Sequence, residues 1–352
     1  MKKKENKISF LTFKEMLEAR KNMKKPKFLW SGIIEGSFGL VFGPSKSGKT
    51  IFCENLAMHL ASGSPEFFGN ALDGSPKKVL FVGLEEFWEN RIERNSKQYD
   101  VLSDVQKALI ENNYMIQPLD FTSKIINDED WISLEKMISD SKAEVVFIDS
   151  ITRMNPGKLE NSNDAEKVMQ KLREICHKTG VTLICIHHTP KMGDKVIDMD
   201  CIKGSSVFAQ ESDFAIAVTQ TPKKIRYVKN VFFRYAADDD ETVKEFNIDS
   251  STWLNFLKDV EEMELINSKD RRRSDDKRDK IVEYLDQNAC TTYETKDLVY
   301  ELTSKLSIKG RQVKTYLSEL VSSKLICSPS MGHYVSTKCT EGNGEVGDGN
   351  KE

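Results

Sequence analysis

Hydrophobic residues between positions 28 and 258 form short continuous runs, with segments of helical spacing between some of them. Segments 51–61 and 165–177 place their apolar residues on one helical stripe, and 226–249 alternates like antiparallel strands. Apolar strands that alternate with helices are typical of a mostly parallel sheet covered on both faces. The pattern therefore predicts an α/β domain over residues 28–258. The runs of strand length are 38–42, 79–83, 145–148, 181–186 and 214–218.

A second, smaller unit is predicted over residues 278–338. Three helices followed by a hairpin are the order of elements in a winged-helix domain, and the apolar residues here follow that order. The helical patterns lie around 281–285, 298–306 and 313–325, and the hairpin runs are 326–327 and 333–335.

Charge marks three further segments. Residues 1–27 carry ten Lys/Arg against three acids, which predicts a basic N-terminal arm. Residues 259–277 are predicted to be a charged linker, with a solvated helix as the alternative, because 259–280 contain eight acids and seven bases but few apolar residues. Residues 339–352 are rich in Gly and acids, which predicts a disordered tail. The net charge of −3 is thus a sum of unlike segments and does not exclude nucleic-acid binding.

Composition limits the class of protein. The 352 residues leave room for about two domains, and 39% hydrophobic with 30% charged residues excludes a disordered chain. The sequence contains no run of about 18 apolar residues, so a membrane span is not expected. No secretory signal follows the basic start. Seven dispersed cysteines without C-x-x-C spacing predict reduced thiols and a cytoplasmic protein.

One motif stands between an apolar strand and a helical pattern and matches G-x-x-x-x-G-K-[ST]. Glycines let the backbone curl so that its N–H groups point at phosphate oxygens, and the helix N-terminus adds its dipole. Lys49 supplies a positive charge for the β- and γ-phosphates, and the Thr50 hydroxyl can ligate Mg²⁺. The motif predicts a phosphate loop for ATP and Mg²⁺. Its residues are Gly43, Pro44, Ser45, Lys46, Ser47, Gly48, Lys49 and Thr50.

Acidic residues follow two of the predicted strands. Asp149 ends the strand 145–148, where a phosphate loop requires a carboxylate for Mg²⁺. Glu85 and Glu86 follow the strand 79–83, and residues just past parallel strands gather in one crevice. A carboxylate there can orient the attacking water or accept its proton. The alternative for these two glutamates is a solvated acidic loop.

Two histidines follow the strand 181–186. A His at this strand end can hydrogen-bond a γ-phosphate and report its loss. His187 and His188 also raise a metal hypothesis, but adjacent strand residues point to opposite faces, and no third ligand has the right spacing along the chain. Zinc is therefore not expected.

Together, the motifs resemble those of RecA-fold ATPases, and in particular the RepA-type hexameric replicative helicases of plasmids and mobile elements. The resemblance covers roughly residues 25–255. It rests on the phosphate loop, Leu84-Glu85-Glu86, Phe147-Ile-Asp149-Ser150, His187-His-Thr-Pro-Lys191, Lys203-Gly-Ser-Ser206 and Asp213-Phe-Ala-Ile216. It implies a RecA-like P-loop NTPase core with a mostly parallel sheet, assembled as a homo-oligomer, typically a hexamer.

The resemblance also implies roles for single residues. Glu85 is similar to the catalytic carboxylate that activates water, with Lys49 beside it, and His188 to the γ-phosphate sensor. The implied single-stranded DNA loop runs from residue 189 to 203, where Asp residues offset its lysines and a plain surface loop is the alternative. Its lysines are Lys191, Lys195 and Lys203.

The family also implies a basic finger from a neighbouring subunit, often within a K-x-R pattern. Val231 stands where that Arg would be, so Lys229 or Arg234 is the candidate. The alternative is a strand with solvated basic residues.

The third helix of the small unit carries basic residues. Arg311 and Lys314 suit phosphate and base contacts in duplex DNA. However, residues 278–338 hold nine bases and seven acids, so protein docking is the alternative.

The sequence thus predicts a Mg²⁺-dependent ATPase that acts on DNA, as a replicative helicase or replication initiator of a plasmid or mobile element. The alternative is a DNA-binding regulator that uses ATP as an oligomerisation switch without unwinding. A P-loop phosphotransferase is a third hypothesis, which leaves the second unit unexplained.

Overall fold

The computed structural model describes residues 10–23, 25–154, 162–190, 195–202, 206–237, 241–267, 271–288, 291–306, 309–322, 325–330 and 332–338. The predicted tail 339–352 lies outside these residues, as do positions 1–9 and 24 of the predicted basic arm. The chain divides into two compact units, Met1–Asn267 and Ser268–Glu352. None of the described helices is long and apolar enough to cross a membrane.

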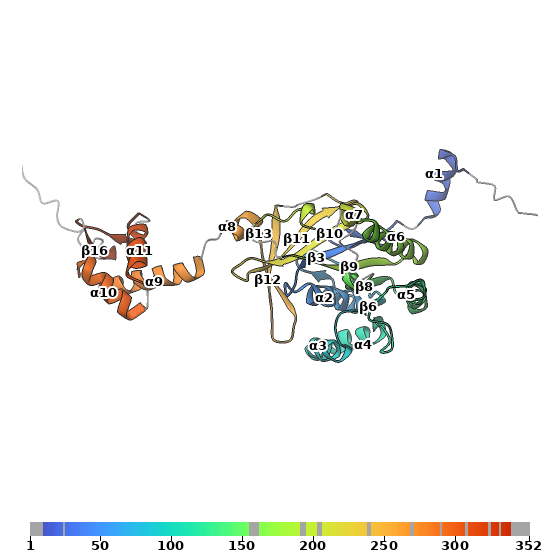
Figure 1. Cartoon of the computed structure of the whole chain (residues 1–352), viewed down its shortest axis with the longest axis horizontal. Coiled ribbons are helices and arrows are strands. Elements are labelled where there is room, and N and C mark those ends of the chain that lie inside the picture. Colours follow the sequence, from blue (N-terminus) through green and yellow to red (C-terminus); the bar gives the residue numbers. More distant parts are fainter. Residues whose placement is uncertain are drawn as a thin grey trace, which may run out of the picture. The chain divides into compact units, whose positions relative to one another are not determined.

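The first unit is built on a nine-stranded sheet in the order β13-β12-β11-β10-β3-β9-β8-β6-β7 (Figure 1). From β10 to β7 every neighbouring pair is parallel, whereas β10 to β13 pair antiparallel. The predicted mostly parallel α/β sheet is confirmed. The strands are β3 (Phe38–Pro44), β6 (Val79–Gly83), β7 (Tyr114–Ile116), β8 (Val145–Asp149), β9 (Thr182–Thr189), β10 (Phe214–Gln220), β11 (Arg226–Phe233), β12 (Thr242–Ile248) and β13 (Leu254–Glu261).

Helices cover both faces of this sheet, because the apolar strand residues alternate between two clusters. Leu40 belongs to the cluster that includes residues of α5, α6 and α7, and its neighbour Val41 to the cluster that includes residues of α2 and α4. The helices of this unit are α1 (Phe13–Asn22), α2 (Lys49–Ser62), α3 (Trp88–Asp100), α4 (Asp104–Asn113), α5 (Asp128–Ser141), α6 (Ser162–Thr179), α7 (Ser206–Gln210) and α8 (Glu262–Asn267).

Several short elements complete the first unit. Two pairs of short antiparallel strands precede β3 and follow α2, and single 3₁₀ turns follow β8 and precede α7. They are β1 (Phe28–Trp30), β2 (Ile33–Ile34), β4 (Glu66–Phe67), β5 (Asn70–Ala71), Ile151–Arg153 and Met199–Cys201.

The strand order determines which predicted site residues lie close together. β9 is inserted between β3 and β8, and β6 follows β8 on the far side. The registers pair Gly43 with His188 and Gly83 with Asp149. Since these strands are parallel, the phosphate loop, the two acidic strand ends and the histidine strand end meet at one edge of the sheet.

The second unit has its own apolar core, which includes Ile281, Leu298 and Val313 from its three helices. Three helices and a hairpin occur in the predicted order, with one further strand, β14, paired to β16. Its elements are α9 (Arg271–Gln287), β14 (Tyr293–Glu294), α10 (Thr295–Leu306), α11 (Gly310–Ser322), β15 (Ile326–Cys327) and β16 (His333–Ser336).

The predicted linker 259–277 overlaps regular elements. Its first residues end β13, and most of the others lie in α8 and the first turns of α9. A sequence rich in alternating charges is compatible with exposed helix as well as with linker, and here helix forms.

Candidate active site

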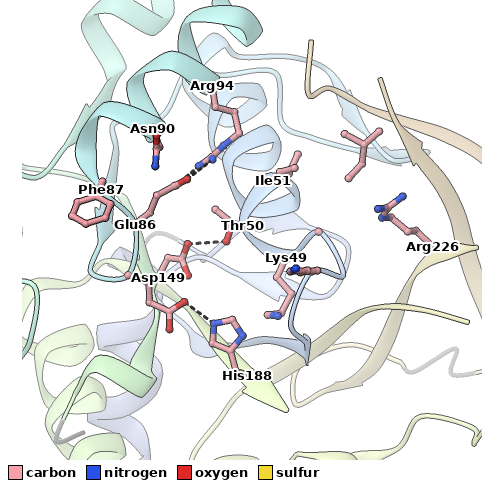
Figure 2. A pocket seen from close by; sticks show the side chains of 14 residues that line it. Lys49, Thr50, Ile51, Glu86, Phe87, Asn90, Arg94, Asp149, His188 and Arg226 are labelled. Carbon is pink, nitrogen blue, oxygen red and sulfur yellow. Dashed lines mark hydrogen bonds and ion pairs between the residues drawn. The ribbon is translucent and has the colours of Figure 1, made fainter. Parts of the chain in front are cut away.

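A cavity of about 620 Å³ lies at the edge of the sheet where the parallel strands end (Figure 2). The phosphate loop forms one wall, and residues at the ends of β8 and β9 and in the segment that follows β6 form another. Two residues of the antiparallel strands, Arg226 and Ile248, also line it. The remaining lining residues are Lys46, Gly48, Lys49, Thr50, Ile51, Glu85, Glu86, Phe87, Asn90, Arg94, Asp149 and His188.

The phosphate loop has the shape that its glycines allow. Gly43 has a φ of 151°, and a Cβ there would lie 2.1 Å from the carbonyl oxygen of Val218 on β10, so only glycine fits. Gly48, with a φ of 109°, immediately precedes α2. Pro44 is the last residue of β3, Ser45 and Lys46 are exposed, and Ser47 is buried.

Lys49 and Thr50, the first residues of α2, reach back over this loop. The Lys49 ammonium donates to the backbone oxygen of Pro44 at 2.8 Å, and the Thr50 hydroxyl donates to Oδ2 of Asp149 at 2.8 Å. Burial lowers the pKa of Lys49 to about 8, against the opposing effect of Asp149 and Glu85. The Lys49 ammonium is thus largely shielded from water and lies near the carboxylates of Asp149 and Glu85.

Asp149 can hold a cation. Burial raises the pKa of this carboxyl, against the effects of Arg91 and of the hydrogen bond from Thr50. Its Oδ1 atom is buried, and no described residue donates a hydrogen bond to it. A buried carboxylate oxygen without a donor, beside a threonine hydroxyl, fits the oxygen ligands that Mg²⁺ takes.

Glu85 is held by three side chains. Its Oε2 lies 2.8 Å from Nε2 of His188, and its Oε1 accepts hydrogen bonds from Ser150 at 3.0 Å and Thr152 at 2.8 Å. Burial raises the pKa of Glu85, but these hydrogen bonds outweigh it and hold the pKa at about 2. Glu85 is therefore an ionised, oriented carboxylate at neutral pH.

The fold brings together a possible set of metal ligands. Spacing along the chain did not indicate this set. One ligand atom each of Glu85, Asp149 and His188 lies within 4.8 Å of the others. Asp149 and His188 lie at the ends of β8 and β9, and Glu85 lies in the segment that follows β6, so the strand order reveals that they are neighbours.

Glu86 points into a different network, which sequence reasoning missed. Arg94 of α3 donates to Glu86 and to Glu54 of α2, and Glu54 also lies 3.3 Å from Nη1 of Arg91. Arg91 is itself buried and lies 3.5 Å from Oδ2 of Asp149. A charged residue within the apolar helix 51–61 was the only signal in the sequence for this network.

Both candidates for the basic finger have partners within their own chain. Lys229 is 2% exposed, and its ammonium lies 2.6 Å from Oε2 of Glu262. A buried and paired ammonium is a poor candidate for reaching a neighbouring subunit, so this structure argues against Lys229 as the finger. Arg234 is half-exposed, but its Nε lies 3.3 Å from Asp213.

Of the residues predicted to contact DNA in the first unit, one is described by the structure. Lys191 and Lys203 fall outside the described residues, and Lys195 is exposed. Arg311 and Lys314 lie on the exposed surface of α11, one turn apart.

Comparisons with known proteins give one family match. The crystal structure of a KaiC-like protein from the archaeon Pyrococcus horikoshii OT3 is similar to this chain, with 18% identity and a TM-score of 0.46 over 66% of this chain and 100% of the other. No curated protein matches the chain. A model of the AAA domain family matches residues 6–194, which include the phosphate loop, Glu85, Asp149 and His188. The chain therefore belongs to the AAA domain family, and its core is an α/β fold whose mostly parallel sheet carries a phosphate loop.

Proposed function

We propose that the protein hydrolyses ATP in a Mg²⁺-dependent reaction and couples hydrolysis to DNA. The observation that carries the ATPase proposal is the placement of two carboxylates across one cavity from the phosphate loop. Glu85 is ionised, and Asp149 has a buried oxygen that could bind a cation. Such a pair of acidic strand ends next to a P-loop is the arrangement that phosphoryl transfer to water requires.

Each side chain has a distinct role in this proposal. The N–H groups at the start of α2 and the Lys49 ammonium bind the phosphates and offset their charge. Thr50 and Asp149 would hold Mg²⁺, which when bound supplies further neutralisation of the phosphate charge. Glu85 orients the attacking water and accepts its proton, and its low pKa keeps it ionised for that role.

His188 connects the site to the rest of the chain. Its Nε2 contacts Glu85, and it lies at the end of β9, from which the chain enters the loop 189–203. Loss of the γ-phosphate would change the partner of this imidazole. We propose that the change is passed to the loop 189–203, where Lys191, Lys195 and Lys203 would contact single-stranded DNA.

The second unit would supply a duplex contact. The order of its elements and its three-stranded sheet support a winged-helix domain, with Arg311 and Lys314 of α11 facing the DNA backbone and bases. The complete proposal is a cytoplasmic ring of identical subunits, such as a hexamer, that acts as a replicative helicase or initiator of a plasmid or mobile element.

One observation favours a second function. Lys229 and Arg234, the two finger candidates, are both engaged by carboxylates of their own chain. Without a cation from a neighbour, P-loop hydrolysis is slow. The protein would then be a DNA-binding regulator whose assembly is switched by ATP and which does not unwind DNA.

Two measurements separate these functions. ATPase activity that single-stranded DNA stimulates strongly, together with strand separation, supports the helicase. Slow hydrolysis that DNA does not stimulate, with preferential duplex binding, supports the switch. Electron microscopy with a non-hydrolysable ATP analogue and single-stranded DNA tests the ring directly, because a helicase ring is threaded by the strand. An absence of ATP binding and hydrolysis would overturn both.

A further inference from the structure

The cavity continues past the phosphate loop on the side away from the acidic strand ends. Arg226, at the start of β11, and Ile248, at the end of β12, line this part together with Ile51 of α2. β12 lies against the loop itself, since a Cβ on Gly48 would lie 3.4 Å from Cδ1 of Ile248. Figure 2 shows Arg226 on the opposite side of Lys49 from Asp149 and Glu86.

Arg226 differs from the other arginines near the cavity. Arg91 and Arg94 each contact two or more carboxylates. Arg226 has no carboxylate partner among the described residues, and its Nε is buried without a hydrogen-bond partner there. A half-buried guanidinium without a partner loses hydration without compensation, which makes it a candidate for contact with a ligand.

The position of the phosphates indicates which part of a bound nucleotide Arg226 would contact. Lys49, Thr50 and Asp149 place the terminal phosphates at the N-terminus of α2, next to Glu85. The ribose and base of a bound nucleotide therefore have to extend away from Glu85, towards Arg226. The lining residues that the antiparallel strands contribute are one aliphatic side chain, Ile248, and one cation, Arg226.

We propose that Arg226 and Ile248 form the nucleoside subsite, in which the planar guanidinium of Arg226 covers the face of the base. A guanidinium stacks on aromatic rings, and aliphatic side chains such as Ile51 and Ile248 give the base an apolar wall. This inference rests on the proposed binding of ATP. It assigns the nucleoside end of the site to the antiparallel strands of the same chain.

Binding measurements test the subsite without relying on turnover. Affinities for ATP and for inorganic triphosphate, both with Mg²⁺, are compared by calorimetry for the wild type and Arg226→Ala. We expect ATP to bind about tenfold more weakly to the variant, the loss of one desolvated cation–π interaction, while triphosphate binds equally well. Lys223→Ala, which removes an exposed cation from the same β-hairpin, is the matched control and should leave both affinities unchanged.

Two outcomes would overturn the subsite. An equal loss of triphosphate affinity places Arg226 on the phosphates, and unchanged ATP affinity removes it from the nucleotide. If Arg226→Ala unfolds, Arg226→Met keeps the aliphatic stem and gives the same comparison. Failure of the ATPase proposal is distinguishable, because the wild type would then bind neither compound. Lys49→Ala is expected to lose both.

Discussion

Nε2 of His188 lies 2.8 Å from Oε2 of Glu85, which joins the end of β9 to the segment that follows β6 across the intervening strand β8. The hydroxyls of Ser150 and Thr152 hold the other oxygen of the same carboxylate. Glu85 therefore has little freedom to turn, and its orientation is set before a nucleotide binds.

Replacing Glu85 should separate binding from turnover. We expect Glu85→Gln to bind ATP with the affinity of the wild type but to reduce kcat by about 10²–10⁴-fold, because the amide cannot accept a proton. Glu86→Gln is the matched control: it lines the same cavity but pairs with Arg94, and kcat should change little. Steady-state kinetics together with nucleotide binding measure both quantities. Normal turnover in Glu85→Gln would remove Glu85 from the mechanism.

The affinity for nucleotide should fall at alkaline pH. The pKa of Lys49 is lowered to about 8 by burial, so the free protein loses this positive charge as the pH rises through 8. Bound phosphates favour the protonated ammonium, and each pH unit above 8 should weaken binding by up to about tenfold. Calorimetry at pH 9 in two buffers of different ionisation enthalpy should detect proton uptake on binding. Affinity that is constant from pH 7 to pH 9 would contradict this role of Lys49.

Glu54 should contribute strongly to stability. It is fully buried and is the shared partner of Arg91 and Arg94. Glu54→Gln leaves both guanidiniums undercompensated, and we expect a loss of about 3–5 kcal/mol in the free energy of unfolding, measured with urea. Glu93→Gln breaks an exposed ion pair with Lys97 within α3, and we expect it to lower the free energy of unfolding by less than about 0.5 kcal/mol. Equal effects of the two changes would show that the network is dispensable.

Lys229 should likewise act on stability rather than on hydrolysis. Lys229→Met leaves the buried carboxylate of Glu262 without its ammonium partner, and the expected cost is about 3–5 kcal/mol. The double variant Lys229→Met/Glu262→Leu should recover part of this loss, because it removes both charges. A folded Lys229→Met protein that has lost ATPase activity would instead restore Lys229 as the finger.

The second unit can be tested by the salt dependence of binding. Full-length protein with Arg311→Ala or Lys314→Ala should bind duplex DNA more weakly, and the slope of log K against log salt should fall by about one for each phosphate that the variant no longer neutralises. Lys296→Ala on α10 removes an exposed cation of the same unit and is the control. Unchanged binding in both α11 variants would favour a protein-docking role.

The parts of the fold that follow from local patterns could be predicted from the sequence. Continuous apolar runs mark the parallel strands. The phosphate loop is recognisable because its spacing is a local backbone requirement, and Asp149 because it directly ends an apolar run. Side-chain pairs that join distant segments could not be predicted. Glu54 lies 40 residues before Arg94, and Glu262 lies 33 residues after Lys229, so their partners depend on strand order and on the path of each helix.

The linker prediction shows a second limit. Alternating charges describe solvent exposure but not backbone conformation, so residues 259–277 gave no local reason to choose between coil and helix. The strand β14 is two residues long, and so short an element carries no periodicity to detect.

Glu262 is the first residue of α8, and its carboxylate accepts hydrogen bonds from the N–H of Ile197 and the hydroxyl of Tyr227 in addition to its contact with Lys229. The ammonium of Lys229 also donates to the carbonyl oxygen of Ile197. The point where the chain leaves the first unit is thus tied to the segment that follows the histidine strand. Mechanical tension on the chain beyond Asn267 would therefore act on Ile197 as well as on β11 and β13, because Glu262 follows β13 directly and contacts Tyr227 and Lys229 of β11.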